Sequence, residues 1–161
     1  MQIGILGLGT VGTGVVELIE KNKNIIAKRL REEVHVKKVL VRDLNKQRTP
    51  LVEGKITDKF EDIIEDEEIS VIVEVMGGEE PALTYIREAL NRGKHVVTAN
   101  KEVVAKHGKE LFEISAKKDV NLLFEASVGG GIPIIRPMKQ CLSANEITKI
   151  MGILNGTTNY I

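Results

Sequence analysis

QIGILGLGTVG, residues 2–12, is the stretch that decides the fold. An apolar strand at 2–6 runs into Gly7-Leu8-Gly9-Thr10-Val11-Gly12, and a helical pattern follows to about residue 31. Gly7 permits a tight turn, Gly9 lets a diphosphate approach the backbone, and Gly12 lets the helix pack against the sheet. The helix start also directs free N–H groups at the phosphates. The stretch therefore predicts a dinucleotide-binding turn; the plainer alternative is a structural strand–turn–helix without a ligand.

Beyond residue 12, strand-like and helix-like stretches alternate, which predicts an α/β fold with a mostly parallel sheet. Ligands then bind at the carboxyl edge of the sheet, where the strands lead into helices. The expected strands are 34–41, 69–75, 95–98, 121–126 and 147–154. The expected helices are 58–66, one beginning near 81, 103–118, and 134–142 with an interruption near Pro137; 43–54 and 127–133 are expected to be loops. The apolar stripe expected on the first helix comprises Val11, Val15, Leu18, Ile19, Ile26 and Leu30.

Composition narrows the class of protein. The chain has 161 residues, 42% of them apolar and 29% charged, with a net charge of zero, which fits a globular domain with a real core. Neutral charge and only 3% aromatic residues argue against a nucleic-acid partner. The single cysteine, Cys141, excludes a disulfide framework within these residues, and we expect it in the core. No export signal or apolar run long enough for a bilayer is visible, so we expect no membrane partner and a cytoplasmic protein.

Five blocks together resemble one known family. They are the glycine stretch at 7–12, VEVMGG at 73–78, VTANK at 97–101, EASVGGGIP at 125–133 and LNGTTNYI at 154–161. In this order, over essentially the whole chain, they resemble the N-terminal part of homoserine dehydrogenase. The resemblance implies a Rossmann-type, doubly wound NAD(P)-binding domain at 1–132. It also implies the opening strand of a substrate and dimerisation domain at 133–161.

The resemblance also implies an activity. The family interconverts L-aspartate 4-semialdehyde and L-homoserine with a nicotinamide nucleotide, on the route to threonine, methionine and isoleucine, and it is homodimeric. The family's later catalytic segment, with an acidic pair and a second lysine, has no counterpart in these residues. We therefore expect the sequence to be cut within a larger protein. A non-catalytic dinucleotide-binding module is the alternative for such a chain.

Lys101 is the candidate catalytic residue. It follows the strand at 95–98, at the edge where a nicotinamide would lie. Hydride transfer to an aldehyde leaves a developing alkoxide, which an ammonium group can stabilise and protonate. The resemblance implies that Asn100 and Lys101 contact the cofactor, and that Met76, Gly77 and Gly78 approach its nicotinamide side. The alternatives are a solvated lysine and a glycine pair that only starts a helix.

Arg42 ends the second strand, where the adenosine ribose is expected. An acidic residue there favours NAD(H), whereas an arginine pairs with the 2′-phosphate of NADP(H). Arg42 precedes Asp43, and Lys46 and Arg48 add positive charge. We expect NADP(H) to be preferred, or both nucleotides to be used. A solvated loop of mixed charge is the alternative.

Glu125 precedes a glycine-rich loop. A carboxylate and the carbonyl oxygens of a tight loop form an oxygen cage that suits a hard cation. The resemblance implies a sodium ion held by the carboxylate of Glu125 and the carbonyls of Val128, Gly130 and Ile132. The alternative is that the glycines only turn the chain.

Overall fold

The computed structural model describes residues 1–152. Its elements alternate as the sequence predicts. In chain order they are β1 (Gln2–Leu6), α1 (Thr10–Leu30), β2 (His35–Leu40), the 3-10 turn η1 (Pro50–Val52), β3 (Ile56–Thr57), α2 (Glu61–Ile64), β4 (Ile69–Glu74), α3 (Ala82–Asn91), β5 (His95–Thr98), α4 (Lys101–Lys117), β6 (Leu122–Leu123), α5 (Glu125–Gly129) and α6 (Ile135–Gln140).

The six strands form one sheet in the order β3-β2-β1-β4-β5-β6, and every pairing is parallel. From β1 the chain proceeds through β2 to β3 at one edge of the sheet. It then returns to place β4 on the other side of β1 and continues through β5 to β6, so the strand order reverses between β1 and β4. In sheets of this kind, ligands bind outside the carboxyl ends of the strands at that switch point. The arrangement confirms the predicted Rossmann-type, doubly wound α/β fold.

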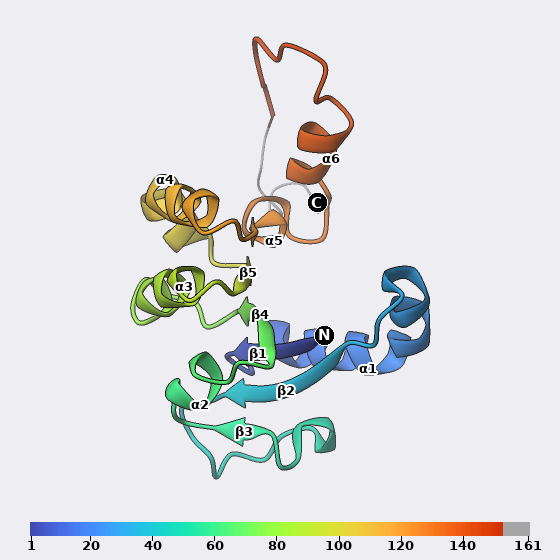
Figure 1. Ribbon diagram of the computed structural model, residues 1–161, viewed down its shortest axis with the longest axis vertical. Helices are drawn as coiled ribbons and strands as arrows, with labels where there is room; N and C mark the ends of the chain where they lie inside the picture. The colour runs from blue at the N-terminus through green and yellow to red at the C-terminus, as the bar shows by residue number, and fades with distance from the viewer. Residues whose placement is uncertain (153–161) are drawn as a thin grey trace.

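Helices cover both faces of the sheet (Figure 1). The α1 face has a core built from alternate strand residues such as Ile3 and Ile5, with Val16 and Ile19 of α1. The opposite core contains Leu6 and Ile72 with side chains of α2, α3 and α4. Because successive strand residues point to opposite faces, β1 supplies both cores. Within residues 1–152, no helix combines the length and the apolar character that a bilayer span requires.

The buried face of α1 differs from the predicted stripe. Gly12, Val16 and Ile19 are the residues of α1 that are buried. Of the predicted stripe, Val11, Leu18 and Leu30 are more than half exposed. The glycine at position 12 lets the helix approach the sheet on that side, so residues spaced from Gly12 face the core.

The C-terminal part differs most from the sequence-based prediction. The expected strand at 121–126 is only Leu122–Leu123, and the next residues, including Glu125 and Val128, form α5. Pro137 does not interrupt α6, because it lies in the first turn, where no backbone N–H is needed. Of the expected strand at 147–154, residues 147–152 form no strand, and 153–154 lie outside the described residues. Cys141 is exposed rather than buried, and the prediction missed β3.

Candidate functional site

The turn between β1 and α1 is shaped by its glycines. Gly7 has φ +101°, a conformation that side chains disfavour, and its N–H donates to Leu40 O at 3.0 Å. A Cβ on Gly12 would lie 2.3 Å from Gly7 O, so only glycine allows this packing of helix on loop. A Cβ on Gly9 would meet no atom within 4 Å. The space above Gly9 is therefore open to an external group, as a diphosphate requires.

A cavity of about 500 Å³ adjoins this turn. It lies across the carboxyl ends of β1, β2 and β4, and it is lined by Gly7, Leu8, Gly9, Leu40, Val41, Arg42, Arg48, Asp58, Val75, Met76, Pro81 and Tyr85. The lining combines apolar side chains with two guanidinium groups, those of Arg42 and Arg48, and one carboxylate, that of Asp58. The structure thus brings together the predicted residues of the glycine turn, Arg42 and Met76.

A second cavity, of about 820 Å³, lies on the α1 side of the same turn. Leu8, Gly9 and Arg48 line both cavities, so the two are neighbours. The rest of the second lining comes from the 46–49 loop, which includes Lys46, and from Thr10, Thr13, Gly14 and Glu17 of α1. Exposed N–H groups and two basic side chains at one helix start suit a ligand with several phosphates.

Arg48 is the cavity residue with an unmet hydrogen bond. Its Nη1 donates to Lys46 O at 2.8 Å. Its Nε is buried and is the one buried side-chain nitrogen or oxygen in the described part of the chain that lacks a partner. A buried donor without an acceptor is costly. Because Arg48 lines both cavities, a phosphate oxygen that reached Nε would supply the acceptor, and the residues present fit a phosphorylated nucleotide.

Arg42 and Asp43 occupy different places. Arg42 lines the smaller cavity. Asp43 appears in neither lining, and its Oδ1 accepts from Asn45 N at 2.9 Å, which shapes the loop. The cationic member of the pair therefore faces the site, whereas the acidic one stabilises the turn.

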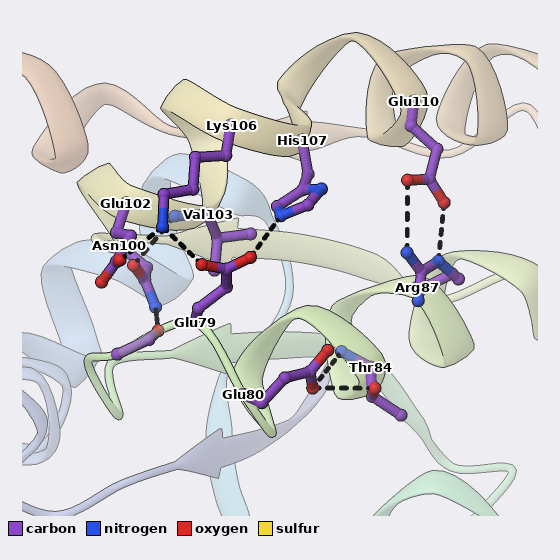
Figure 2. A network of polar contacts seen from close by, with 11 residues as sticks. Glu79, Glu80, Thr84, Arg87, Asn100, Glu102, Val103, Lys106, His107 and Glu110 are labelled. Carbon is purple, nitrogen blue, oxygen red and sulfur yellow. Dashed lines mark hydrogen bonds and ion pairs between the residues drawn. The ribbon is translucent and has the colours of Figure 1, made fainter.

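The loops after β4 and β5 lie side by side. Gly77 and Gly78 follow Met76 with φ values of +75° and +77°. Asn100 caps α4 by accepting from Val103 N at 3.2 Å, and its Nδ2 donates to Gly78 O at 2.6 Å (Figure 2). Lys101 is exposed and is the first residue of α4. Gly77, Gly78, Asn100 and Lys101 thus share one end of the sheet, although none of them lines the two cavities.

Ion pairs support these two loops from outside. Figure 2 shows Glu79 between Lys106 and His107 of α4. Its carboxylate oxygens lie 2.5 Å from Lys106 Nζ and 2.8 Å from His107 Nε2. The hydrogen bond from Lys106, followed by that from His107, holds the pKa of Glu79 below its ordinary value. Lys106 also pairs with Glu102. The loop that bears Gly77 and Gly78 is therefore fastened to the first turns of α4.

The carboxylate of Glu125 faces α6 in this structure. It accepts backbone N–H groups of Ile134, Ile135 and Arg136, the last two at 2.8 Å. These bonds, that of Ile134 first, lower the pKa of Glu125. Val128 lies in α5, and Gly130 and Ile132 follow it. In residues 1–152 no group of three or more His, Cys, Asp and Glu side chains is placed to hold a metal; a cage of one carboxylate and backbone carbonyls stays a prediction.

Two features of the site were missed by sequence reasoning. The sequence marks Arg48 only as nearby positive charge, because a loop position gives no sign of which side chain turns inward. Glu74 stands within the VEVMGG block with no role predicted for it, yet it is fully buried at the end of β4. A lone carboxylate in a strand of apolar residues is itself a signal, since such residues are rarely buried without a purpose.

Comparisons with known proteins agree on one family. A family model described as "Homoserine dehydrogenase, NAD binding domain" matches residues 7–125, and one described as "Homoserine dehydrogenase" matches 133–161. Homoserine dehydrogenase of Bacillus subtilis is 45% identical over 162 aligned residues, and that of Synechocystis is 48% identical. Each alignment includes 100% of this chain and 37% of the relative, so the chain spans little more than a third of their length.

Solved structures give the same result. The homoserine dehydrogenase of Thiobacillus denitrificans superposes with a TM-score of 0.84 and 43% identity, over 90% of this chain and 34% of that one. A hyperthermophilic archaeal homoserine dehydrogenase in complex with NADPH superposes with a TM-score of 0.70 and 26% identity. That alignment covers 85% of this chain and 47% of the other.

Proposed function

The chain belongs to the homoserine dehydrogenase family and matches its NAD-binding region, and from this we propose what the whole protein does. It interconverts L-aspartate 4-semialdehyde and L-homoserine, and these residues hold its nicotinamide nucleotide. The observation that carries the proposal is the cavity beside Gly7–Gly12, with an open backbone at Gly9 and the unbonded Nε of Arg48. Threonine, methionine and isoleucine synthesis would use the product.

We propose NADP(H) as the preferred nucleotide. Arg42 and Arg48 line the same cavity, whereas Asp43 is engaged in its own loop. Two guanidinium groups suit a ribose 2′-phosphate, because arginine forms strong charge-assisted bonds with phosphate oxygens. The structure of a relative that contains NADPH supports the same preference.

We propose Lys101 as the catalytic residue of the nucleotide domain. The bound dihydronicotinamide would supply the hydride. Negative charge then develops on the aldehyde oxygen, and the Lys101 ammonium stabilises that charge and donates the proton. Lys101 is exposed at the start of α4, next to the loop that bears Gly77 and Gly78, so a substrate can reach it. Met76, Gly77, Gly78 and Asn100 would flank the nicotinamide.

We also propose the family's domain division, with 1–132 as the nucleotide domain and 133–161 as the start of a substrate and dimerisation domain, in a homodimer. The first family model ends at residue 125 and the second begins at residue 133, which supports this boundary.

We propose a sodium ion at Glu125, which is compatible with the contacts of this carboxylate. A carboxylate has about four acceptor positions, and the three N–H groups use three of them. A melting temperature that is unchanged when tetramethylammonium replaces sodium would count against the ion.

Nucleotide binding tests the first part of the proposal. Titration of the chain with NADPH, followed by fluorescence, should saturate. Gly9→Ala should keep the melting temperature, because its Cβ meets no protein atom, yet weaken NADPH binding by roughly 10-fold or more, because the methyl group enters the diphosphate space. Gly152→Ala, also in open space, is the matched control. No saturable binding by folded wild-type chain would refute the proposal.

Turnover tests the second part, and it requires the full-length protein. Lys101→Met should lower kcat for semialdehyde reduction by about 100-fold or more, because the developing charge loses its stabilising cation. The NADPH dissociation constant should stay within about threefold, since phosphates and adenosine supply most of the affinity. Lys109→Met, an exposed position of the same helix, should leave both unchanged. Normal turnover by Lys101→Met would exclude the catalytic role.

A further inference from the structure

Glu74 is a fully buried carboxylate at the last position of β4. Its Oε1 accepts from Met76 N at 2.8 Å, and its Oε2 accepts from Thr98 Oγ1 at 2.6 Å. Thr98 ends β5 and is 1% exposed. A buried carboxylate is costly unless donors converge on it. Here one donor lies in the loop after β4 and the other at the end of β5, on the two sides of the predicted nicotinamide position.

The connection continues beyond Thr98. Its hydroxyl oxygen accepts from Asn100 N at 3.0 Å. Asn100, 6% exposed, then donates from Nδ2 to Gly78 O at 2.6 Å and caps α4 through Val103 N, as Figure 2 shows. A closed circuit therefore runs from Glu74 along the β4 loop to Gly78, across to Asn100, and back through Thr98.

The circuit contains or directly adjoins the residues whose relative position matters for the proposed hydride transfer. Gly77 and Gly78 lie in its first arm, and Lys101 directly follows Asn100 in its second. Both glycines have positive φ and exposed backbone, so they have little packing of their own to hold them. The outer ion pairs of Glu79 are partly exposed to solvent, and such pairs restrain geometry more weakly than buried hydrogen bonds do. The buried hydrogen bonds are the firmer restraint.

We propose that Glu74 is a positioning residue, which acts through Thr98 and Asn100 to hold the Gly77–Gly78 backbone and Lys101 in one fixed relative position. The inference rests on the proposed function. A carboxylate suits this role because it only accepts hydrogen bonds, and both groups that face it are donors. Glutamine offers one acceptor oxygen in place of two, so either the Met76 N–H or the Thr98 hydroxyl would lose the atom to which it donates, and one arm of the circuit would loosen.

The test uses the full-length protein and separates positioning from stability. Glu74→Gln and Thr98→Val should each lower kcat by roughly 10- to 100-fold, since misplacement by about 1 Å costs that much. The NADPH dissociation constant should stay within about threefold, because the phosphate and adenosine contacts are untouched. Thr98→Ser keeps the hydroxyl and should restore most of the rate that Thr98→Val loses.

Lys94→Met is the matched control. Lys94 is 7% exposed and donates to Asp66 O and Ile69 O, both at 2.7 Å, at the opposite edge of the sheet. Its loss should lower the melting temperature but not kcat. The inference is overturned if Glu74→Gln keeps its kcat within about twofold, if Thr98→Ser is as slow as Thr98→Val, or if kcat in all variants simply follows the melting temperature.

Failure of the proposed function would look different. In that case the wild-type protein itself would neither bind NADPH nor reduce the semialdehyde, and the inference would fall with it. If Glu74→Gln does not fold, the Thr98→Ser and Thr98→Val pair still decides, because the two differ in a hydroxyl and a methyl group at one site. Equal kcat in that pair would then overturn the inference.

Discussion

Arg42 and Arg48 both lie in the loop after β2 and line the smaller cavity, and each can be tested alone. Replacing either by Ala should weaken NADPH binding by roughly 10- to 100-fold, since a charged hydrogen bond contributes about 1.5–3 kcal/mol. NADH lacks the 2′-phosphate, so its dissociation constant should change by less than about threefold. Parallel fluorescence titrations with the two nucleotides measure the difference.

Arg29→Ala is the control for net charge, because Arg29 is exposed in the last turn of α1, outside both linings. It should leave both dissociation constants unchanged. If Arg42→Ala weakened only NADH binding, the preference for NADP(H) would be wrong. If Arg48→Ala changed neither the NADPH nor the NADH dissociation constant, the buried Nε of Arg48 would not bind the nucleotide.

At the scale of elements, the packing of α1 on β1 depends on the absence of one methyl group. Gly12→Ala would place Cβ 2.3 Å from Gly7 O, which the helix can avoid only by moving away from the turn. We expect a loss of about 1–3 kcal/mol in the free energy of unfolding. Gly14→Ala, two positions later in the same helix, meets nothing within 4 Å and should stabilise by about 0.5–1 kcal/mol.

Urea unfolding of both variants, followed by circular dichroism, measures these changes. The two substitutions have the same chemistry and opposite expected signs, so helix propensity is controlled within the pair. A Gly12→Ala protein as stable as wild type would mean that the turn relaxes easily. The close approach of Gly12 to Gly7 would then not be what fixes the helix against the sheet.

The central elements were predictable from sequence because their patterns are strong. β1, β4 and β5 are apolar runs bounded by glycine or polar residues, and the predicted bounds agree closely with the structure. The carboxyl-edge position of Arg42, Met76 and Asn100 followed from the same pattern. The conformation of the turn between β1 and α1 was also predictable, because three glycines at this spacing after a strand are typical of one kind of turn.

Other elements depend on contacts that local sequence does not display. The two-residue strands β3 and β6 are too short to carry a pattern, and they form because a neighbouring strand is already in place. The sequence pattern places Glu125 within a strand at 121–126, whereas in the structure it begins α5 and accepts from the backbone of α6. The buried circuit of Glu74 joins residues 24 positions apart, so no local period reveals it.

For the whole molecule, low pH should weaken the ion pairs that connect different elements of the fold. Asp66 bridges to Lys37 of β2, and Glu110 bonds Arg87 across α3 and α4. Hydrogen bonds from Lys37 and Arg87 lower the pKa of Asp66 from 3.8 and that of Glu110 from 4.5. Carboxyls with a lowered pKa in the folded state contribute stability that is full above the ordinary value and is lost as pH falls through the folded one.

The melting temperature should therefore vary little through these groups from pH 7 to pH 5, and fall below about pH 4.5. Raising the salt concentration should reduce their contribution, because both pairs are partly exposed to solvent. Asp66→Asn should flatten part of the acid decline, whereas Glu113→Gln, on the exposed face of α4, should not. A decline of the same depth in Asp66→Asn would show that the bridge to Lys37 contributes nothing.

The parallel sheet also leaves one end of the molecule available for attachment. Because the strands are parallel, all of them begin at the edge of the sheet opposite the two cavities. Turns that precede a strand, such as the one before β2, therefore lie away from the cavities. Glu33, with a side chain 77% exposed, offers a place there for a dye or a linker to a solid support. A chain attached to a support through this position would keep both cavities open to the solution, so it could serve as a sensor for their ligand.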